Sequence, residues 1–201
     1  MAVLPTRDAV ILPGAVNELA VGRAGSVAAL RSAAENDGHV VVLLQRRASI
    51  DEPGPEDLHP VGTLCRVLDA ERQSADSASI GMVGVDRVRV LSVDRSGDAL
   101  FAQVESMEWK PVEPEMSEVL RESLVAIIDQ GLRIQFSGRT LGALRAENVI
   151  ERLCVLSVVA PMSPAELQVV LEHGDLKPVV EALMVLEDDS WFTRFVWWLR
   201  K

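Results

Sequence analysis

The sequence predicts an α+β fold, in which a β-rich first part with one short helix precedes a bundle of helices. Up to about residue 109, alternating and β-branched residues dominate, and helix-period patterns follow. Pro111 and Pro114 lie between the two patterns and interrupt strands and helices alike. We therefore expect a β-rich domain over residues 1–110, a hinge at 111–114 and a helical domain over 115–201.

The β-rich part is expected to begin with two short strands and a helix. The strands are predicted around Val10-Ile11 and Leu19-Ala20-Val21, on either side of the turn Leu12-Pro13-Gly14. A helix is predicted from Ser26 to Asn36 and should end at Gly38. The helical spacing of Val27, Leu30 and Ala34 supports this helix.

A central strand and a β-meander are expected next. The run from His39 to Gln45 is too apolar for a half-exposed strand, so it should cross the core. Residues 49–60 are acidic and proline-rich and predict a loop. Strands of a small barrel-like sheet should follow at 61–68, 79–85, 87–93 and 99–108, with turns at 74–77, near Asp86 and at 95–98.

The helical part shows several amphipathic stripes that should pack as a bundle. One stripe comprises Leu120, Leu124, Ile127 and Ile128, and a second comprises Val149, Ile150, Leu153 and Leu156. Ser163 to Glu166 form a capping box, with proline at the first helical position, and this helix should stop at His173-Gly174. A last helix should begin near Leu176-Lys177-Pro178.

Charge and composition restrict the classes of function and compartment. The net charge is −10 and both halves are acidic, which opposes a nucleic-acid partner because phosphate binding requires a basic face. No leader-like start and no run of about 18 apolar residues occurs, so we expect a cytoplasmic protein without integral membrane association. Cys65 and Cys154 each lie in an apolar stretch, which predicts buried free thiols.

No motif for catalysis, metal or nucleotide binding stands out. His39, His59 and His173 lack a ligand spacing suited to a metal, and the chain has no phosphate-binding glycine-lysine loop. The carboxylates of Asp51-Glu52 and Glu56-Asp57 are expected in a solvated loop, whereas acid–base catalysis needs a desolvated pocket. We therefore expect a protein that is not an enzyme and uses no cofactor.

Several segments, in order, resemble the N-terminal domain family of Lon proteases. The opening combines Leu4-Pro5-Thr6-Arg7-Asp8 with the Val10–Gly14 and Leu19–Arg23 stretches, and an acidic loop leads to Val61-Gly62-Thr63. Further similar segments are 83–90, 101–105 and 149–186. The resemblance implies a PUA-like β-rich subdomain and a helical subdomain that meet substrates or adaptors. The ATPase and peptidase modules of that family are not found in these 201 residues.

The resemblance implies a non-catalytic protein that recognises protein or unfolded peptide segments, and we expect a stand-alone form. A groove between the two subdomains would accept an extended segment. The family usually has a more apolar first loop than this chain, where Glu18 and Ala20 stand, so we expect a narrower range of partners. The predicted contact residues are Pro13, Gly14, Val16, Asn17, Glu18, Leu19, Arg23, Glu52 and Leu58.

The C-terminal segment suggests an alternative to peptide recognition by the first loop and the groove. Residues 191–198 hold five of the eight aromatic residues, which is typical of interface anchors but also of a last helix folded onto the bundle. An adaptor or regulator could dock on a protease or another complex through this segment, or the chain could form a homo-oligomer. The residues predicted for this role are Trp191, Phe195 and Trp198. A further alternative is that the chain is the N-terminal portion of a full Lon protease.

Overall fold

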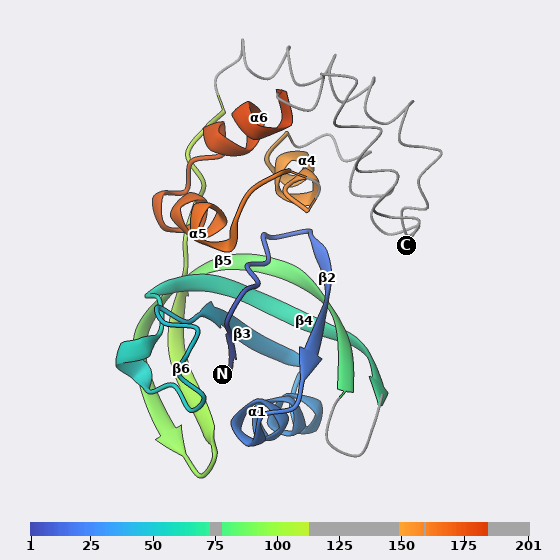
Figure 1. The fold of residues 1–201 in the computed structure, drawn as a ribbon, viewed down its shortest axis with the longest axis vertical. Helices are drawn as coiled ribbons and strands as arrows, with labels where there is room; N and C mark the ends of the chain where they lie inside the picture. Colours follow the sequence, from blue (N-terminus) through green and yellow to red (C-terminus); the bar gives the residue numbers. More distant parts are fainter. Residues whose placement is uncertain (73–77, 113–148, 159, 185–201) are drawn as a thin grey trace.

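The fold is α+β, a mixed six-stranded sheet accompanied by helices (Figure 1). The computed structural model describes residues 1–72, 78–112, 149–158 and 160–184. The strands are β1 (Ala2–Thr6), β2 (Val16–Val21), β3 (His39–Leu44), β4 (Val61–Arg72), β5 (Ala78–Ser96) and β6 (Ala99–Ser106). The helices are α1 (Ala24–Glu35), the 3₁₀ turn η1 (Pro55–Asp57), α4 (Val149–Leu156), α5 (Pro164–His173) and α6 (Lys177–Met184).

The sheet closes into a barrel. β1 pairs in parallel with β3 and antiparallel with β6, while β4 joins β3 to β5 and β5 returns to β6. β2 is a sixth strand that pairs with residues 78–83 of β5, and no other strand of the described chain pairs with it. The predicted central strand is confirmed, since β3 lies between β1 and β4.

The prediction of a strand at Val10-Ile11 is wrong, and the first strand is β1 instead. Residues 9–12 do not form a strand, because side chains of this segment pack into two different hydrophobic cores. Val10 and Leu12 pack with the helices α4 to α6, whereas Ile11 packs between the sheet and α1. Thr63 Oγ1 donates a hydrogen bond to Ile11 O at 2.5 Å and holds this segment in place.

The predicted break near Asp86 is also wrong, because β5 continues through it as one strand. The strand accommodates the change of direction with a register shift in its pairing with β4, where Gly84 faces Cys65 and Asp86 faces Leu64. Gly84 is required at this point, since a Cβ there would lie 2.3 Å from Leu12 O. The irregular segment and β5 therefore approach more closely than a side chain permits.

Helix α1 is confirmed, and Leu30, one of the three residues at helical spacing, packs partly buried against the core between the sheet and α1. Its buried residues are Ser26, Ala29 and Ala33, whereas Val27 is 40% exposed. The small side chains let the helix approach the barrel closely, and Figure 1 shows it across one end of the barrel. The short distance between α1 and the barrel therefore leaves room for small side chains, but not for large apolar ones, on the buried face of the helix.

The helices that follow agree with their local signals. Ser163 caps α5, with Glu166 N bonded to Ser163 Oγ and the Glu166 carboxylate accepting from Ser163 N at 2.7 Å. Gly174 ends α5 in the left-handed conformation at φ +63°. α4 and α6 also lie where they were predicted. The stripe at 120–128 and the turn at 74–77 fall outside the described residues.

The barrel and the helices share a hydrophobic core. Val10, Leu12, Leu44 and Val61 of the β-rich part pack with buried residues of all three described helices that follow the barrel. This core fixes the position of the described helices on the barrel. A groove that accepts an extended segment between the two parts stays a prediction.

Candidate functional site

The first turn lies against α4. Gly14 adopts φ +81°, and its N–H donates to Gly84 O at 2.8 Å. A Cβ on Gly14 would lie 3.3 Å from Val155 Cγ2, so the turn touches the helix directly. Pro13 forms an isolated bridge with Gly84 of β5, and both Pro13 and Gly14 are partly buried. These two residues of the predicted site therefore offer limited surface to a partner.

The remaining first-loop residues lie on β2, where neighbours point to opposite faces. Leu19 packs against the core between sheet and α1, whereas Glu18 is exposed and accepts a hydrogen bond from Ser79 Oγ. Val16 is half-buried. Asn17 Oδ1 is buried and has no hydrogen-bond partner in the described structure. One edge of β2 pairs with no strand there, and an unpaired edge can accept an extended peptide.

Arg23 joins three parts of the barrel where α1 begins. Its guanidinium donates to Gln45 Oε1 at 2.6 Å and to Pro5 O at 2.5 Å, and it reaches Asp51 O at 3.3 Å. Burial lowers the pKa of Arg23, as does the nearby cation Arg7, while Asp51 opposes this. Arginine stays protonated despite such shifts, so a positive charge is held beside the start of α1.

The acidic loop is more ordered than its composition predicts. Asp57 is only 7% exposed and accepts hydrogen bonds from Arg47 Nη2 at 2.9 Å and Gly54 N at 3.0 Å. The hydrogen bond from Arg47 is the main reason that the pKa of Asp57 is lowered. Leu58 is 4% exposed and packs inside the sheet. Leu58 was predicted to contact a partner, but its side chain is part of the hydrophobic core.

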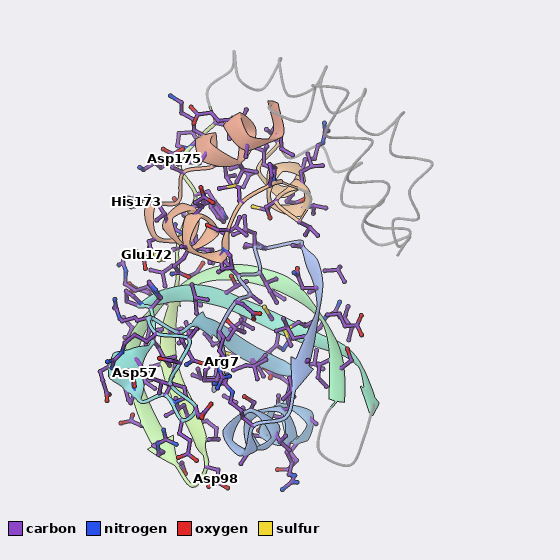
Figure 2. All side chains as sticks on the ribbon, in the orientation of Figure 1. Arg7, Asp57, Asp98, Glu172, His173 and Asp175 are labelled. Carbon is purple, nitrogen blue, oxygen red and sulfur yellow. The ribbon has the colours of Figure 1, made fainter. Side chains whose placement is uncertain are left out.

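A cavity of about 260 Å³ lies between the start of α1, the acidic loop and the β5–β6 hairpin. Two residues of the predicted site, Arg23 and Glu52, line it, and none of the first-turn residues does. Figure 2 shows Asp98, another lining residue, at the end of the hairpin farthest from the helices α4 to α6. The structure thus divides the predicted residues between the cavity, the β2 edge and the core.

A polar contact between barrel and helices was missed by sequence reasoning. His59 Nδ1 lies 2.7 Å from Glu172 Oε1, and Gln168 Nε2 donates to both Glu172 Oε1 at 3.1 Å and Val61 O at 2.9 Å. Burial opposes ionisation of Glu172, but the hydrogen bonds from His59 and Gln168 outweigh it and lower the pKa. His59 and Glu172 are 113 residues apart, so no local signal could pair them.

Arg87 is a second connection that the sequence did not indicate. It is 2% exposed, and its guanidinium donates to Leu171 O at 2.5 Å, Glu108 O at 2.6 Å and Glu172 O at 3.1 Å. It also lies 5.2 Å from the ring centre of Trp109. Two of the three carbonyls belong to the last turn of α5, where a cation is favoured. Arg87 therefore ties α5 to the barrel.

The aromatic residues Trp191, Phe195 and Trp198 lie outside the described residues. No helix in the described part of the chain is both long and apolar enough to span a membrane. The two cysteines, Cys65 and Cys154, are free and buried, as predicted.

Comparison with known proteins identifies the family. A family model described as the ATP-dependent protease La (LON) substrate-binding domain matches residues 1–186. Lon protease of Escherichia coli K12 is 28% identical over 191 residues, which cover 94% of this chain and 24% of that protein. Lon protease of Anaeromyxobacter dehalogenans is 35% identical over 112 residues, covering 56% of this chain and 13% of that protein.

A solved structure shows the same fold. The N-terminal domain of Mycobacterium avium complex Lon protease superposes with a TM-score of 0.68 at 17% identity, covering 94% of this chain and 98% of that one. The chain spans about a quarter of the length of the Escherichia coli relative. The order of its elements, its barrel with attached helices and the match over residues 1–186 together show that this chain belongs to the family of Lon protease substrate-binding domains.

Proposed function

We propose that this chain recognises polypeptide segments and itself makes or breaks no bond. The match to a substrate-binding domain over residues 1–186 carries the proposal, because the relatives are proteases and the substrates of proteases are polypeptides. The proposal concerns these 201 residues, whether they act alone or within a longer protein.

Two surfaces of the described structure suit such a role. The cavity beside α1 has apolar walls and charged residues at its rim, which is the usual composition of a recognition pocket. The free edge of β2 can pair with an extended segment through main-chain hydrogen bonds. Glu18 on this strand adds a negative charge that favours segments with basic residues.

The described residues favour binding over covalent chemistry. Burial raises the pKa of Cys65 well above its ordinary value, and burial together with Glu151 raises the pKa of Cys154 to about 12. Thiols in such surroundings are poor nucleophiles. Within the described ranges, no three His, Cys, Asp or Glu side chains are grouped so that they could hold a metal ion.

An array of overlapping peptides from a protease substrate tests the proposal. The purified chain should retain a subset of peptides that are rich in apolar residues, and retention should persist at high salt because apolar contacts are not screened. Retention of no peptide would contradict the proposal. Retention that follows peptide charge alone and disappears at high salt would contradict it as well.

Docking through the C-terminal aromatic segment remains a second candidate, supported by the gathering of five aromatic residues in positions 191–198. Deletion of residues 190–201 separates the two roles. If the segment only docks a partner or a second copy, the shortened chain should keep its peptide binding and lose that association. A cytoplasmic location and homo-oligomer formation likewise remain predictions.

A further inference from the structure

Strand β2 has one edge that no strand of the described chain covers. On its other edge, its six residues pair with residues 78–83 of β5 without a register shift. The other described strands close on one another, because β6 pairs with both β1 and β5. Among the described strands, β2 therefore offers main-chain groups to a further strand, and Figure 1 shows it beside the barrel, between α4 and α1.

The main-chain groups at this edge can be assigned from the pairing on the other side. Gly84 N donates to Ala15 O at 3.0 Å, in the segment that leads into β2. In an antiparallel ladder every second residue bonds to the partner strand, so the N–H and C=O groups of Glu18 and Ala20 point away from β5. Sheet edges are usually protected by proline, by lysine or by a bulge. β2 contains none of these three in its pairing with β5.

The two faces of β2 differ in character. Glu18 and Ala20 are exposed on one face, whereas Leu19 packs against the core between the sheet and α1. A strand placed beside β2 would alternate its side chains in the same way. Its residue opposite Glu18 would lie in solvent, and the two neighbours of that residue would lie beside Leu19 and Asn17, on the face toward α1.

Glu18 supplies a charge that selects a partner. Its carboxylate accepts a hydrogen bond from Ser79 Oγ, and it forms no ion pair with the described residues. Opposite charges on neighbouring strands stabilise the pairing, and like charges destabilise it. A basic residue opposite Glu18 is therefore favoured. A second copy of this chain is disfavoured, because pairing about the middle of β2 brings two Glu18 carboxylates together.

Asn17 supplies a second and independent observation. Its Oδ1 is buried and has no hydrogen-bond partner in the described structure. Buried polar atoms are normally hydrogen-bonded, so an exception calls for an explanation. Asn17 lies on the strand at the edge of the sheet, where a neighbouring strand would bring hydrogen-bond donors beside it. The unpaired acceptor therefore fits a sheet that lacks its next strand.

We infer that β2 binds an extended segment as an antiparallel strand, with an apolar residue opposite Leu19, a basic residue opposite Glu18 and an amide or hydroxyl side chain opposite Asn17. From its N-terminus, such a segment reads apolar, basic, polar. The inference rests on the proposed recognition of polypeptides and names the orientation and the residue pattern that this edge takes. Main-chain hydrogen bonds give affinity in this mode of binding, and alternate side chains give specificity. Antiparallel pairs are also slightly more stable per residue than parallel pairs.

The test uses a fluorescein-labelled peptide with Ile-Lys-Gln between threonine and serine residues, measured by fluorescence anisotropy. The lysine N–H points at β2 in the inferred register, so N-methylation of the lysine should weaken binding about tenfold or more. The isoleucine N–H points away, so N-methylation of the isoleucine should weaken binding less than about threefold. Replacement of the lysine by glutamate should weaken binding about fivefold at low salt.

Three variants of the protein test particular groups. Glu18→Gln keeps an acceptor for Ser79 Oγ but removes the charge, so it should weaken binding of the lysine peptide about fivefold and remove the preference for lysine over glutamate. Glu35→Gln removes an exposed carboxylate at the end of α1 and is the matched control, which should change nothing. Ala20→Pro removes an N–H that points away from β5, so it should keep the circular dichroism of the parent and weaken binding about tenfold or more.

Several results would overturn the inference. Equal weakening by the two N-methyl groups would show that the segment is not held as a strand in this register, and unchanged binding by Ala20→Pro would place the bound segment elsewhere. A dimer seen in sedimentation of the parent chain and absent in Ala20→Pro would show that a second copy occupies the edge. If peptides bind on the array but the Ile-Lys-Gln peptide does not bind, only this inference fails. If no peptide binds anywhere, the proposed function fails.

Discussion

Replacing Arg87 should weaken the attachment of the helical part to the barrel. Arg87→Met keeps a long aliphatic stem but removes donors to three carbonyls, Leu171 O, Glu108 O and Glu172 O. A hydrogen bond to a charged group contributes about 1.5–3 kcal/mol, and the effects of one side chain are not additive. We expect the free energy of unfolding to fall by about 3–5 kcal/mol, a large part of a typical domain's stability.

The assay is urea denaturation, followed by circular dichroism for the whole fold and by tryptophan fluorescence, to which Trp109 beside Arg87 contributes. The control is Arg89→Met, two residues along the same strand. Arg89 pairs with Glu105 at 2.9 Å, and both side chains are about half exposed, so its loss should cost about 0–1 kcal/mol. Equal losses for the two variants would refute the conclusion that Arg87 connects barrel and helices.

Three further predictions concern the same junction and its helices. Gly174→Ala should destabilise the fold by more than about 1–2 kcal/mol in urea denaturation, because φ is +63° and the new Cβ would lie 2.7 Å from Arg87 Nη1; an unchanged midpoint would contradict this. Ser163→Ala should cost about 1 kcal/mol by the same assay, with Ser163→Asp close to the parent, since aspartate also caps helices. Hydrogen bonds lower the pKa of Glu172 in the folded chain, so its ionised carboxylate stabilises the fold at neutral pH, and this contribution should be lost as the pH falls through the pKa of the folded state. The pH dependence of stability should flatten in Glu172→Gln, and identical curves for the two proteins would contradict the assignment.

Features that depend on neighbouring residues could be predicted from the sequence. The cap at Ser163 and the left-handed conformation of Gly174 depend only on residues within a turn of the helix end that each one forms. The strand β3 is apolar along its whole length because it is covered on both faces. These elements were expected at nearly their observed bounds, since no distant contact is needed to define them.

Features that depend on distant contacts could not be predicted. The irregular path of Val10 to Leu12 follows from two cores that form only after the helices pack on the barrel. Leu58, predicted as a contact residue, packs inside the sheet with residues that are distant in the sequence. Among the predicted contact residues that the structure describes, Arg23 and Glu52 line the cavity of about 260 Å³. No local pattern could show this, because the third wall of the cavity comes from a hairpin more than forty residues further along the chain.

Titration with a permanently unfolded polypeptide tests the central claim most directly. A reduced and carboxymethylated protein should bind the purified chain saturably in isothermal titration calorimetry, and its native, folded form should not bind. The proposed function predicts this difference because the main-chain groups and apolar side chains that a recognition surface would contact are buried in a folded protein and exposed in an unfolded one. No heat of binding with the unfolded form, or equal binding of both forms, would contradict it.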